Sequence, residues 1–274
     1  MKNNQLAVEK TIEAKLVTVK KFQEILLQNS IWLFLIICLI FFSFSSQYFL
    51  TVTNLTNVLV QGSFIGLLAI GMTLCIINGN IDLTVGAVLG LAASLAVGLQ
   101  AEYGIVISIL AALAAGLLLG LLNGVVTVFS GVNAFIVTLG GMIGIRGLVF
   151  VYTNEQSFFA TDMRFIEFNE IIIGSTIISL ISTLFIVLIL FFQWFLSRTV
   201  HGRDAYAIGG NLQAAENAGI RVKKHIIINF AISGFLAAVS GVLLASRMGS
   251  STPNLGNIYE LWTIIAVVLG GTRL

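Results

Sequence analysis

Residues 25–81 read ILLQNSIWLFLIICLIFFSFSSQYFLTVTNLTNVLVQGSFIGLLAIGMTLCIINGNI, 57 consecutive residues without a single Asp, Glu, Lys or Arg. A helix needs about 20 mainly apolar residues to cross the ~30 Å core of a bilayer, so this stretch is long enough for two spans. The whole chain of 274 residues has the same character, since 58% of it is hydrophobic and 9% is charged. Ordinary soluble domains are about 25% charged. The composition therefore excludes a disordered chain, argues against a soluble enzyme and predicts a membrane protein.

The gaps between charged residues predict an all-α, polytopic bundle of transmembrane helices. Barrel strands would alternate apolar and polar residues over about ten positions, whereas these runs are continuously apolar. Seven full spans and a cut-short eighth that begins near residue 258 are expected. The seven lie at about 31–50, 56–77, 83–100, 104–128, 134–152, 172–196 and 226–247.

The basic residues predict the orientation of these spans. Five lysines lie in residues 1–30 and five Lys or Arg lie between 198 and 224, whereas 153–171 carries four carboxylates against Arg164. Because basic loops stay in the cytoplasm, we expect the N-terminus and the loop 197–225 inside and the loop 153–171 outside. Residues 1–30 are expected to form an amphipathic segment on the inner membrane surface, and 31–274 the transmembrane domain.

Two features inside the apolar regions suggest more than simple spanning. The polar segment 78–84 is either a cytoplasmic turn or a broken helix whose free backbone groups face a cavity, as in many transporters. Arg146 lies within the fifth predicted span, where a charge is costly unless it is paired or hydrated. We hypothesise that Asp82 is its partner.

Small residues recur at four-residue spacing in several predicted spans, where they allow close approach of helix backbones in lipid. Ordinary bundle packing is one interpretation, and a glycine-lined dimer seam or pore wall is the other. The positions are Gly62 and Gly66, Gly86 and Gly90, and Gly116, Gly120 and Gly124.

The chain lacks the motifs of an intramembrane hydrolase and of a pump that hydrolyses ATP by itself. Neither histidine lies in a predicted span, there is no G-x-S-x-G motif, and no set of residues suggests a metal or a cofactor. No lysine follows a glycine, so there is no phosphate-binding P-loop. A pump built on this chain needs an ion gradient or an ATPase on another chain.

The basic loop contains GRDAYAIGGNLQAAENAGIRV at 202–222, in which 212–218 suits a short helix that ends at Gly219. This loop resembles the cytoplasmic loop of permease subunits of ribose-type monosaccharide ABC importers. The segment QAAENAG at 213–219 is similar to the E-A-A-x-x-x-G pattern of bacterial import permeases, with Gln213 where Glu is usual. Other stretches that resemble the family in order are NLTNVLVQ, LLAIGMTLCIINGNIDLTVGAVLGL, GLLNGVVTV, FIVTLGGMIGIRGLVFVYT and ISGFLAAVSGVLLASRMGSSTPNLGNIYELWTIIAVVLGG.

The resemblance implies a multi-pass transport subunit of the bacterial inner membrane, without nucleic-acid partners. Two copies would form the pathway in the lipid bilayer, a periplasmic sugar-binding protein would dock near 153–171 and 249–257, and an ABC ATPase would engage the loop. Such permeases continue for roughly fifty residues beyond G-G-T, so the chain is expected to be C-terminally truncated. The expected ATPase-coupling residues are Gly202, Arg203, Tyr206, Gly209, Gly210, Asn211, Ala214, Ala215, Glu216 and Gly219.

For sugar passage, polar groups in an otherwise apolar pathway are needed to bind hydroxyls. The alternative to an ABC permease is an ion-coupled secondary sugar carrier, which would need intramembrane carboxylates to bind the coupling ion. Asp82 is the only candidate before Glu260, which favours the ABC permease. The candidate pathway residues are Asn78, Asn80, Asp82, Thr84, Arg146, Ser250, Ser251, Thr252 and Asn254.

Overall fold

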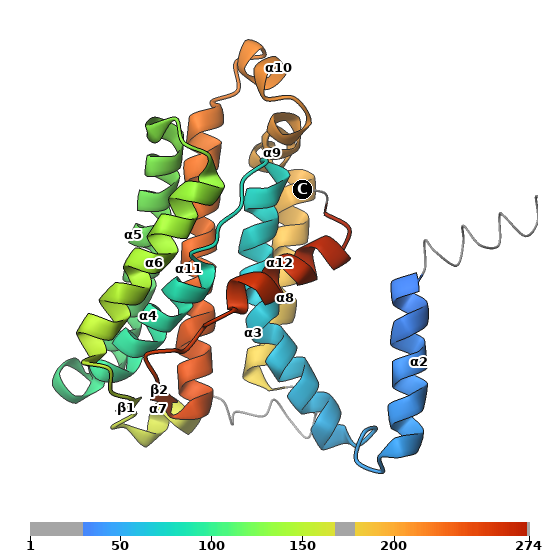
Figure 1. Ribbon diagram of the computed structural model, residues 1–274, viewed down its shortest axis with the longest axis vertical. Coiled ribbons are helices and arrows are strands. Elements are labelled where there is room, and N and C mark those ends of the chain that lie inside the picture. The colour runs from blue at the N-terminus through green and yellow to red at the C-terminus, as the bar shows by residue number, and fades with distance from the viewer. Residues whose placement is uncertain (1–29, 168–178, 273–274) are drawn as a thin grey trace, which may run out of the picture. The chain divides into compact units, whose positions relative to one another are not determined.

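The computed structural model describes residues 30–167 and 179–272 (Figure 1). The amphipathic segment predicted at 1–30 falls outside the described residues except for Ser30. The elements in chain order are α2 (Ser30–Ser45), α3 (Val52–Ile77), α4 (Val85–Gly98), α5 (Gln100–Ser130), α6 (Ala134–Thr153), β1 (Phe158–Phe159), α7 (Met163–Glu167), α8 (Leu180–Arg198), α9 (Val200–Gly210), α10 (Leu212–Asn217), α11 (Val222–Met248), β2 (Ser250–Ser251) and α12 (Tyr259–Leu269).

The chain divides into two compact units, Met1–Leu55 and Thr56–Leu274. The described part of the first unit contains α2, whose large apolar side chains are exposed, and a turn that begins where the Ser46 N–H donates to the carbonyl of Phe42. The second unit contains all the candidate functional residues.

Five helices in the described residues are long and apolar enough to cross a membrane, namely α3, α5, α6, α8 and α11. They correspond to five of the seven predicted spans. The predicted first span, 31–50, is a shorter helix in the structure, α2, and the predicted eighth is the 11-residue helix α12. The structure therefore agrees with a helical, multi-pass membrane protein.

The structure differs most from the prediction at 83–100. Helix α4 has 14 residues, about 21 Å at 1.5 Å per residue, which is less than the bilayer core. Twelve of its residues are buried, and it packs against α5, α6, α11 and α12. An apolar run is as compatible with a helix buried among other helices as with one facing lipid, which is why the sequence pattern gave a full span here.

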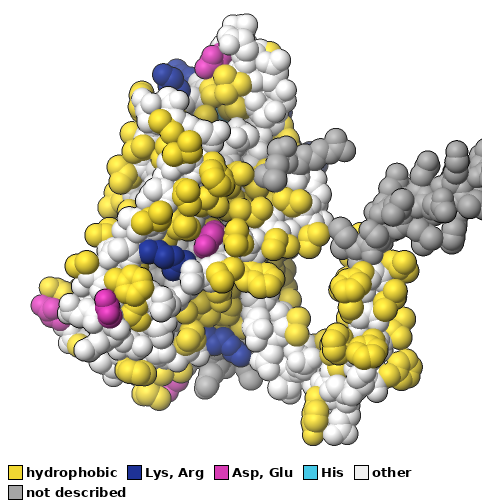
Figure 2. Space-filling view, in the orientation of Figure 1, with side chains coloured by type: hydrophobic (Ala, Val, Ile, Leu, Met, Phe, Trp, Pro, Cys, Tyr) yellow, Lys and Arg dark blue, Asp and Glu magenta, His cyan; other side chains and the backbone are white. Residues whose placement is uncertain are grey.

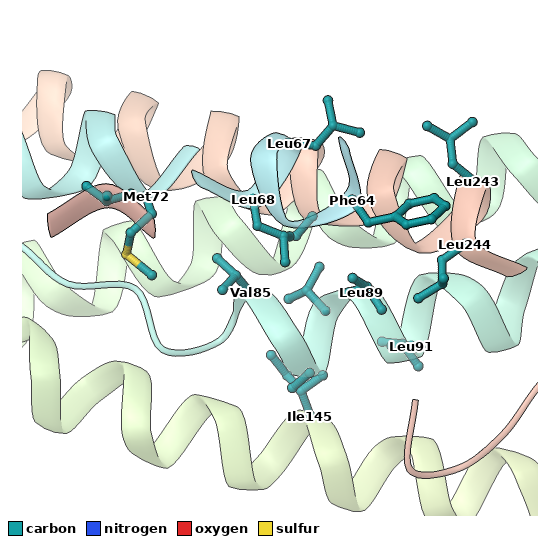
Figure 3. Close-up of a cluster of buried hydrophobic side chains, with 14 of the residues drawn as sticks. Phe64, Leu67, Leu68, Met72, Val85, Leu89, Leu91, Ile145, Leu243 and Leu244 are labelled. Atoms are coloured by element: carbon teal, nitrogen blue, oxygen red, sulfur yellow. The ribbon is translucent and has the colours of Figure 1, made fainter. Parts of the chain in front are cut away.

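The core of the second unit lies where α3, α4 and α11 meet (Figure 3). Phe64, Leu68 and Met72 of α3 lie close to side chains of α4 and α11, among them Leu89 and Leu244. Since lipid is as apolar as leucine, such a core is stabilised by close packing rather than by removal from water.

Glycines bring the backbones of α5 and α11 into contact. A Cβ at Gly234 of α11 would collide with the carbonyl oxygen of Gly116, and one at Gly120 with that of Phe230. Gly124 likewise faces Ile227 and Phe230. For the stripe at 116–124 the structure therefore shows bundle packing within the chain.

Helix α11 connects two differently built ends of the unit. It follows α10 directly, and its last turn is next to β2, which pairs antiparallel with β1 in the register Phe158↔Ser251 and Phe159↔Ser250. At 27 residues it is about 40 Å long. The basic loop that holds α9 and α10 and the acidic loop that holds β1 and α7 consequently lie at opposite ends of this helix (Figure 1).

Candidate functional site

The polar segment 78–84 is a break between two helices, buried in protein. Helix α3 ends at Ile77, Gly79 adopts φ +73°, and α4 begins at Val85. Asn78, Asp82 and Thr84 are all buried. A cytoplasmic turn would expose these side chains to water, so the structure favours the broken helix of the two interpretations.

Asp82 is the centre of a buried hydrogen-bond network at this break. Its Oδ1 accepts bonds from the backbone N–H of Thr84 (3.0 Å) and from the Thr84 hydroxyl (2.5 Å), and its Oδ2 accepts one from the Ser233 hydroxyl (2.8 Å). Asn123 donates to the Thr84 hydroxyl oxygen at 2.9 Å. The carboxylate also lies just before the N-terminus of α4, where the helix dipole favours negative charge. Asp82 thus joins the break to α11 and α5.

The segment 251–260 runs along α4 in the opposite direction. The hydroxyl oxygens of Ser251 and Ser94 are 3.0 Å apart, a Cβ at Gly90 would lie 2.5 Å from the carbonyl oxygen of Leu255, and one at Gly86 would lie 2.5 Å from that of Gly256. Gly86 and Gly90 therefore form the surface of α4 against which this segment packs.

Helix α12 begins where this segment ends, beside the N-terminal end of α4. Gly256 and Ile258 both have positive φ, +77° and +70°, which turns the chain into the helix. Non-helical backbone at membrane depth is tolerated where protein covers it, and α4 provides that cover. The second unit therefore contains two short helices, α4 and α12, whose N-termini lie close together.

Arg146 pairs with Glu260, and the hypothesis that it pairs with Asp82 is wrong. Its Nη2 donates to the carbonyl oxygen of Gly256 (2.8 Å) and lies 3.7 Å from Oε2 of Glu260, whereas the carboxylate of Asp82 is engaged by Thr84 and Ser233. Sequence reasoning did not include Glu260 among the pathway residues. The available signal was a lone carboxylate at the beginning of the last apolar run.

The structure separates the predicted pathway residues into two groups. Asn78, Asn80, Asp82 and Thr84 precede the N-terminus of α4, while Ser251 contacts Ser94 near its C-terminus. Ser250 and Thr252 are half-buried and Asn254 is exposed. The two groups are separated by most of α4, so they do not form one site.

The loop between α8 and α11 is more ordered than the sequence suggested. The predicted short helix is present as α10, capped by the Asn211 side chain, which accepts from the N–H of Ala214 (2.9 Å), and followed by Gly219 at φ +84°. The preceding residues form a second helix, α9, which was not predicted. Eight of the ten predicted coupling residues are exposed, and the other two, Gly202 and Ala215, are buried.

Close contacts attach this loop to the rest of the unit. A Cβ at Gly209 would collide with the carbonyl oxygen of Ile77 at the end of α3. Nε2 of His201 is 2.7 Å from Oδ1 of Asn229, and Nε2 of His225 is 3.2 Å from Oδ2 of Asp204, so α9 is also tied to α11.

A cavity of about 420 Å³ lies at this junction of the loop with the end of α3. It is lined by residues of three segments, namely Thr73 and Ile77 of α3, Tyr206, Gly209 and Gly210 of α9, and Gly270, Gly271 and Thr272 after α12.

The acidic loop at the other end of α11 is held by backbone pairing. The Ala160 N–H donates to the carbonyl of Gly249 (2.9 Å), and the Ser246 hydroxyl donates to the carbonyl of Phe165. In the exposed turn before α7, hydrogen bonds from Arg164 hold the pKa of Asp162 below its usual range.

The sequence has clear relatives among characterised proteins. It is 39% identical to the ribose import permease RbsC of Bacillus subtilis (88% of this chain, 75% of that protein) and 35% identical to the D-allose transport system permease AlsC of Escherichia coli K12 (86% and 73%). The galactose/methyl galactoside import permease MglC of the same strain is 34% identical (92% and 80%). No solved structure matches the chain significantly.

Residues 54–274 match the family described as "Branched-chain amino acid transport system / permease component". That range covers the helix break, the 251–260 segment and the loop with α9 and α10. The chain belongs to this family, and it is a membrane-spanning permease subunit of an ABC importer, a transport component whose ATPase is a separate chain.

Proposed function

We propose that this permease carries a monosaccharide across the bacterial inner membrane, with the loop that holds α9 and α10 in the cytoplasm. The names of the relatives, import permeases for ribose, allose and galactose, support a sugar over an amino acid. The basic composition of the loop supports its cytoplasmic position. A periplasmic sugar-binding protein would dock at the opposite end of α11, near 153–171 and 249–257.

The observation that carries the coupling role is the shape of α10. It is a capped helix whose side chains are exposed except for Ala215, which is buried and packs with Ile208 and Val222. Ile208 is on α9 and Val222 begins α11. A displacement of α10 would therefore act directly on the first turn of α11, which reaches the helix break through Ser233.

Co-purification with the cognate ATPase tests this docking. Gly219 and Gly131 both follow helices with positive φ (+84° and +69°) and both have open space where a Cβ would be. Gly219→Glu should abolish ATPase binding, while Gly131→Glu, which carries the same backbone strain outside the loop, should retain it. Equal binding by the two variants would show that α10 is not the docking element.

Uptake into proteoliposomes tests the substrate. With ATPase, binding protein and ATP supplied, radiolabelled ribose, allose or galactose should accumulate and leucine should not. Accumulation of leucine alone would assign the chain to amino-acid transport.

We also propose that the permease acts as a homodimer through α6. Gly140, Gly144 and Gly147 are exposed on one face of this helix, and a Cβ at any of them would meet nothing within 4 Å. Small residues at such spacing let helices approach closely in lipid, and no part of the described chain packs against these three glycines.

A further inference from the structure

The pair formed by Arg146 and Glu260 lies at membrane depth in the second unit. Glu260 packs against Gly86. Gly86 is four residues after Asp82, and Asp82 accepts a hydrogen bond from Ser233 of α11. Ser233 is 11 residues from the start of α11 and 15 from its end. The pair is therefore near the middle of the bundle rather than at either surface.

The hydrogen-bonding capacity of this pair is only partly used. Oε2 of Glu260 is buried and, among the described residues, has no hydrogen-bond partner, since the 3.7 Å to Nη2 of Arg146 is longer than a hydrogen bond. The one hydrogen bond of Arg146 in the described residues uses Nη2, although a guanidinium has five donors. Buried polar atoms are normally satisfied by protein or ordered water, so this carboxylate oxygen can accept a hydrogen bond from a group outside the described residues.

The pair is partly exposed within a mainly apolar surface. The side chains of Arg146 and Glu260 remain 18% and 10% exposed, and next to them Ile143, Leu261 and Trp262 are exposed and apolar. On the face drawn in Figure 2, charged side chains are few. Charged side chains in membrane helices almost always face a bundle interior or a water-filled cavity, which favours water over lipid at the exposed edge of this pair.

We infer that Arg146 and Glu260 line the sugar pathway and bind sugar hydroxyls in transit, which rests on the proposed function above. The carboxylate accepts from a hydroxyl proton while the guanidinium donates to a hydroxyl oxygen, and neighbouring hydroxyls of a sugar present both groups. A loose pair suits a transient contact, because the sugar inserts without breaking a short ion pair. The turn 255–259 and the glycines beneath it fix Glu260 for this contact.

The decisive measurement is the number of sugar molecules transported per ATP hydrolysed, in proteoliposomes with ATPase and a saturating binding protein. Radiolabelled ribose is the probe, with allose and galactose in parallel. Glu260→Gln keeps the shape of the side chain, and Arg146→Lys keeps its charge. Each should lower this ratio about tenfold, as expected for one hydrogen bond to a charged group, with ATP hydrolysis within twofold of wild type. Glu102→Gln, outside both the proposed pathway and the ATPase-engaging loop, serves as the control.

A parallel fall in sugar uptake and ATP hydrolysis, or an unchanged ratio, would show that the pair is structural. If the wild type takes up none of the sugars, the proposed function fails instead, and the two failures are distinct.

Thiol labelling checks the exposure to water independently of transport. In a chain without Cys38 and Cys75, Leu261→Cys should react with a charged, membrane-impermeant reagent, whereas Leu118→Cys, exposed on α5, should not. An unreactive cysteine at 261 would place the pair away from water and overturn the inference.

Discussion

Among single residues, Asp82 depends most on its hydrogen-bond partners. Its carboxylate is fully buried and, in the described residues, no cation lies within ion-pair distance of it. Its charge is stabilised by the bonds from Thr84 and Ser233 and by the N-terminus of α4. Removing one partner of a buried charge costs more than removing one partner of a neutral pair. The bond from Ser233 is therefore expected to matter more than other hydroxyl bonds on α11.

Ser233→Ala is predicted to destabilise the protein by roughly 2 kcal/mol. Ser240→Ala is the matched control, because that hydroxyl is also buried on α11 and donates to a neutral acceptor, the carbonyl of Phe64 (2.9 Å); its loss should cost about 1 kcal/mol. Thermal unfolding in detergent measures both. Equal midpoints for the two variants would mean that the Asp82 carboxylate does not depend on Ser233.

Gly209 and Gly210 offer a second comparison between neighbours. A Cβ at 209 would collide with the carbonyl oxygen of Ile77, whereas one at 210 would meet nothing within 4 Å. Gly209→Ala should push α9 away from α3, costing about 1–3 kcal/mol and lowering sugar uptake, and Gly210→Ala should leave the unfolding midpoint unchanged. Unfolding midpoints and uptake rates check this. If Gly209→Ala has the midpoint and uptake rate of the wild type, the close contact between α9 and α3 is contradicted.

The partners of individual buried residues could not be predicted from the sequence. The cost of a charge in a span correctly marked Arg146 as needing a partner, but charge alone did not distinguish Asp82 from Glu260. Which carboxylate pairs with Arg146 depends on the positive-φ turn at 256–258 and on the packing of this segment against Gly86 and Gly90. Both are properties of the folded backbone. Likewise, nothing in the sequence indicated that Ser233 would satisfy the carboxylate of Asp82.

At the scale of elements, the sequence predicted the long spanning helices well and the shorter helices α4 and α9 less well. Helices α5, α6 and α11 are close to their predicted bounds because charges and turn residues delimit them; Asn133, for example, caps α6 by accepting from the N–H of Phe135 (2.8 Å). Helix α4 was predicted too long, and α9 was missed, because apolarity does not report whether lipid or protein surrounds a helix and a polar loop can be helical.

The packing of α4 against 251–260 makes a prediction about the element as a whole. Gly86→Ala would place a methyl group against the Glu260 carboxylate and the Gly256 carbonyl, which should displace the start of α12 and destabilise the protein by about 1–3 kcal/mol. Gly62→Ala, in a helix position with open space, should be neutral or slightly stabilising. Thermal unfolding of the two variants provides the comparison, and equal midpoints would show that the segment does not rest on α4.

At the scale of the whole molecule, the second unit links its two ends through one helix. Along α11, Asn229 donates to the carbonyl of Leu74 (2.9 Å), Ser233 to Asp82 and Ser240 to the carbonyl of Phe64. These bonds tie α11 to α3 and to the helix break over much of its length. A displacement that begins at α10 therefore reaches the break through hydrogen-bonded contacts and does not need a separate linker.

The proposed homodimer gives the last prediction, because the glycine stripes of the chain differ in whether they are filled. Gly116, Gly120 and Gly124 face α11 within the chain, whereas Gly140, Gly144 and Gly147 of α6 face open space. Gly144→Leu should thus weaken self-association at least tenfold without changing the unfolding midpoint by more than a few degrees. Ile136→Leu, on the same exposed face but similar in volume, should associate as wild type does. Single-molecule counting of labelled subunits in lipid nanodiscs separates the outcomes. If Gly144→Leu remains as dimeric as the wild type, the dimer seam lies on another helix.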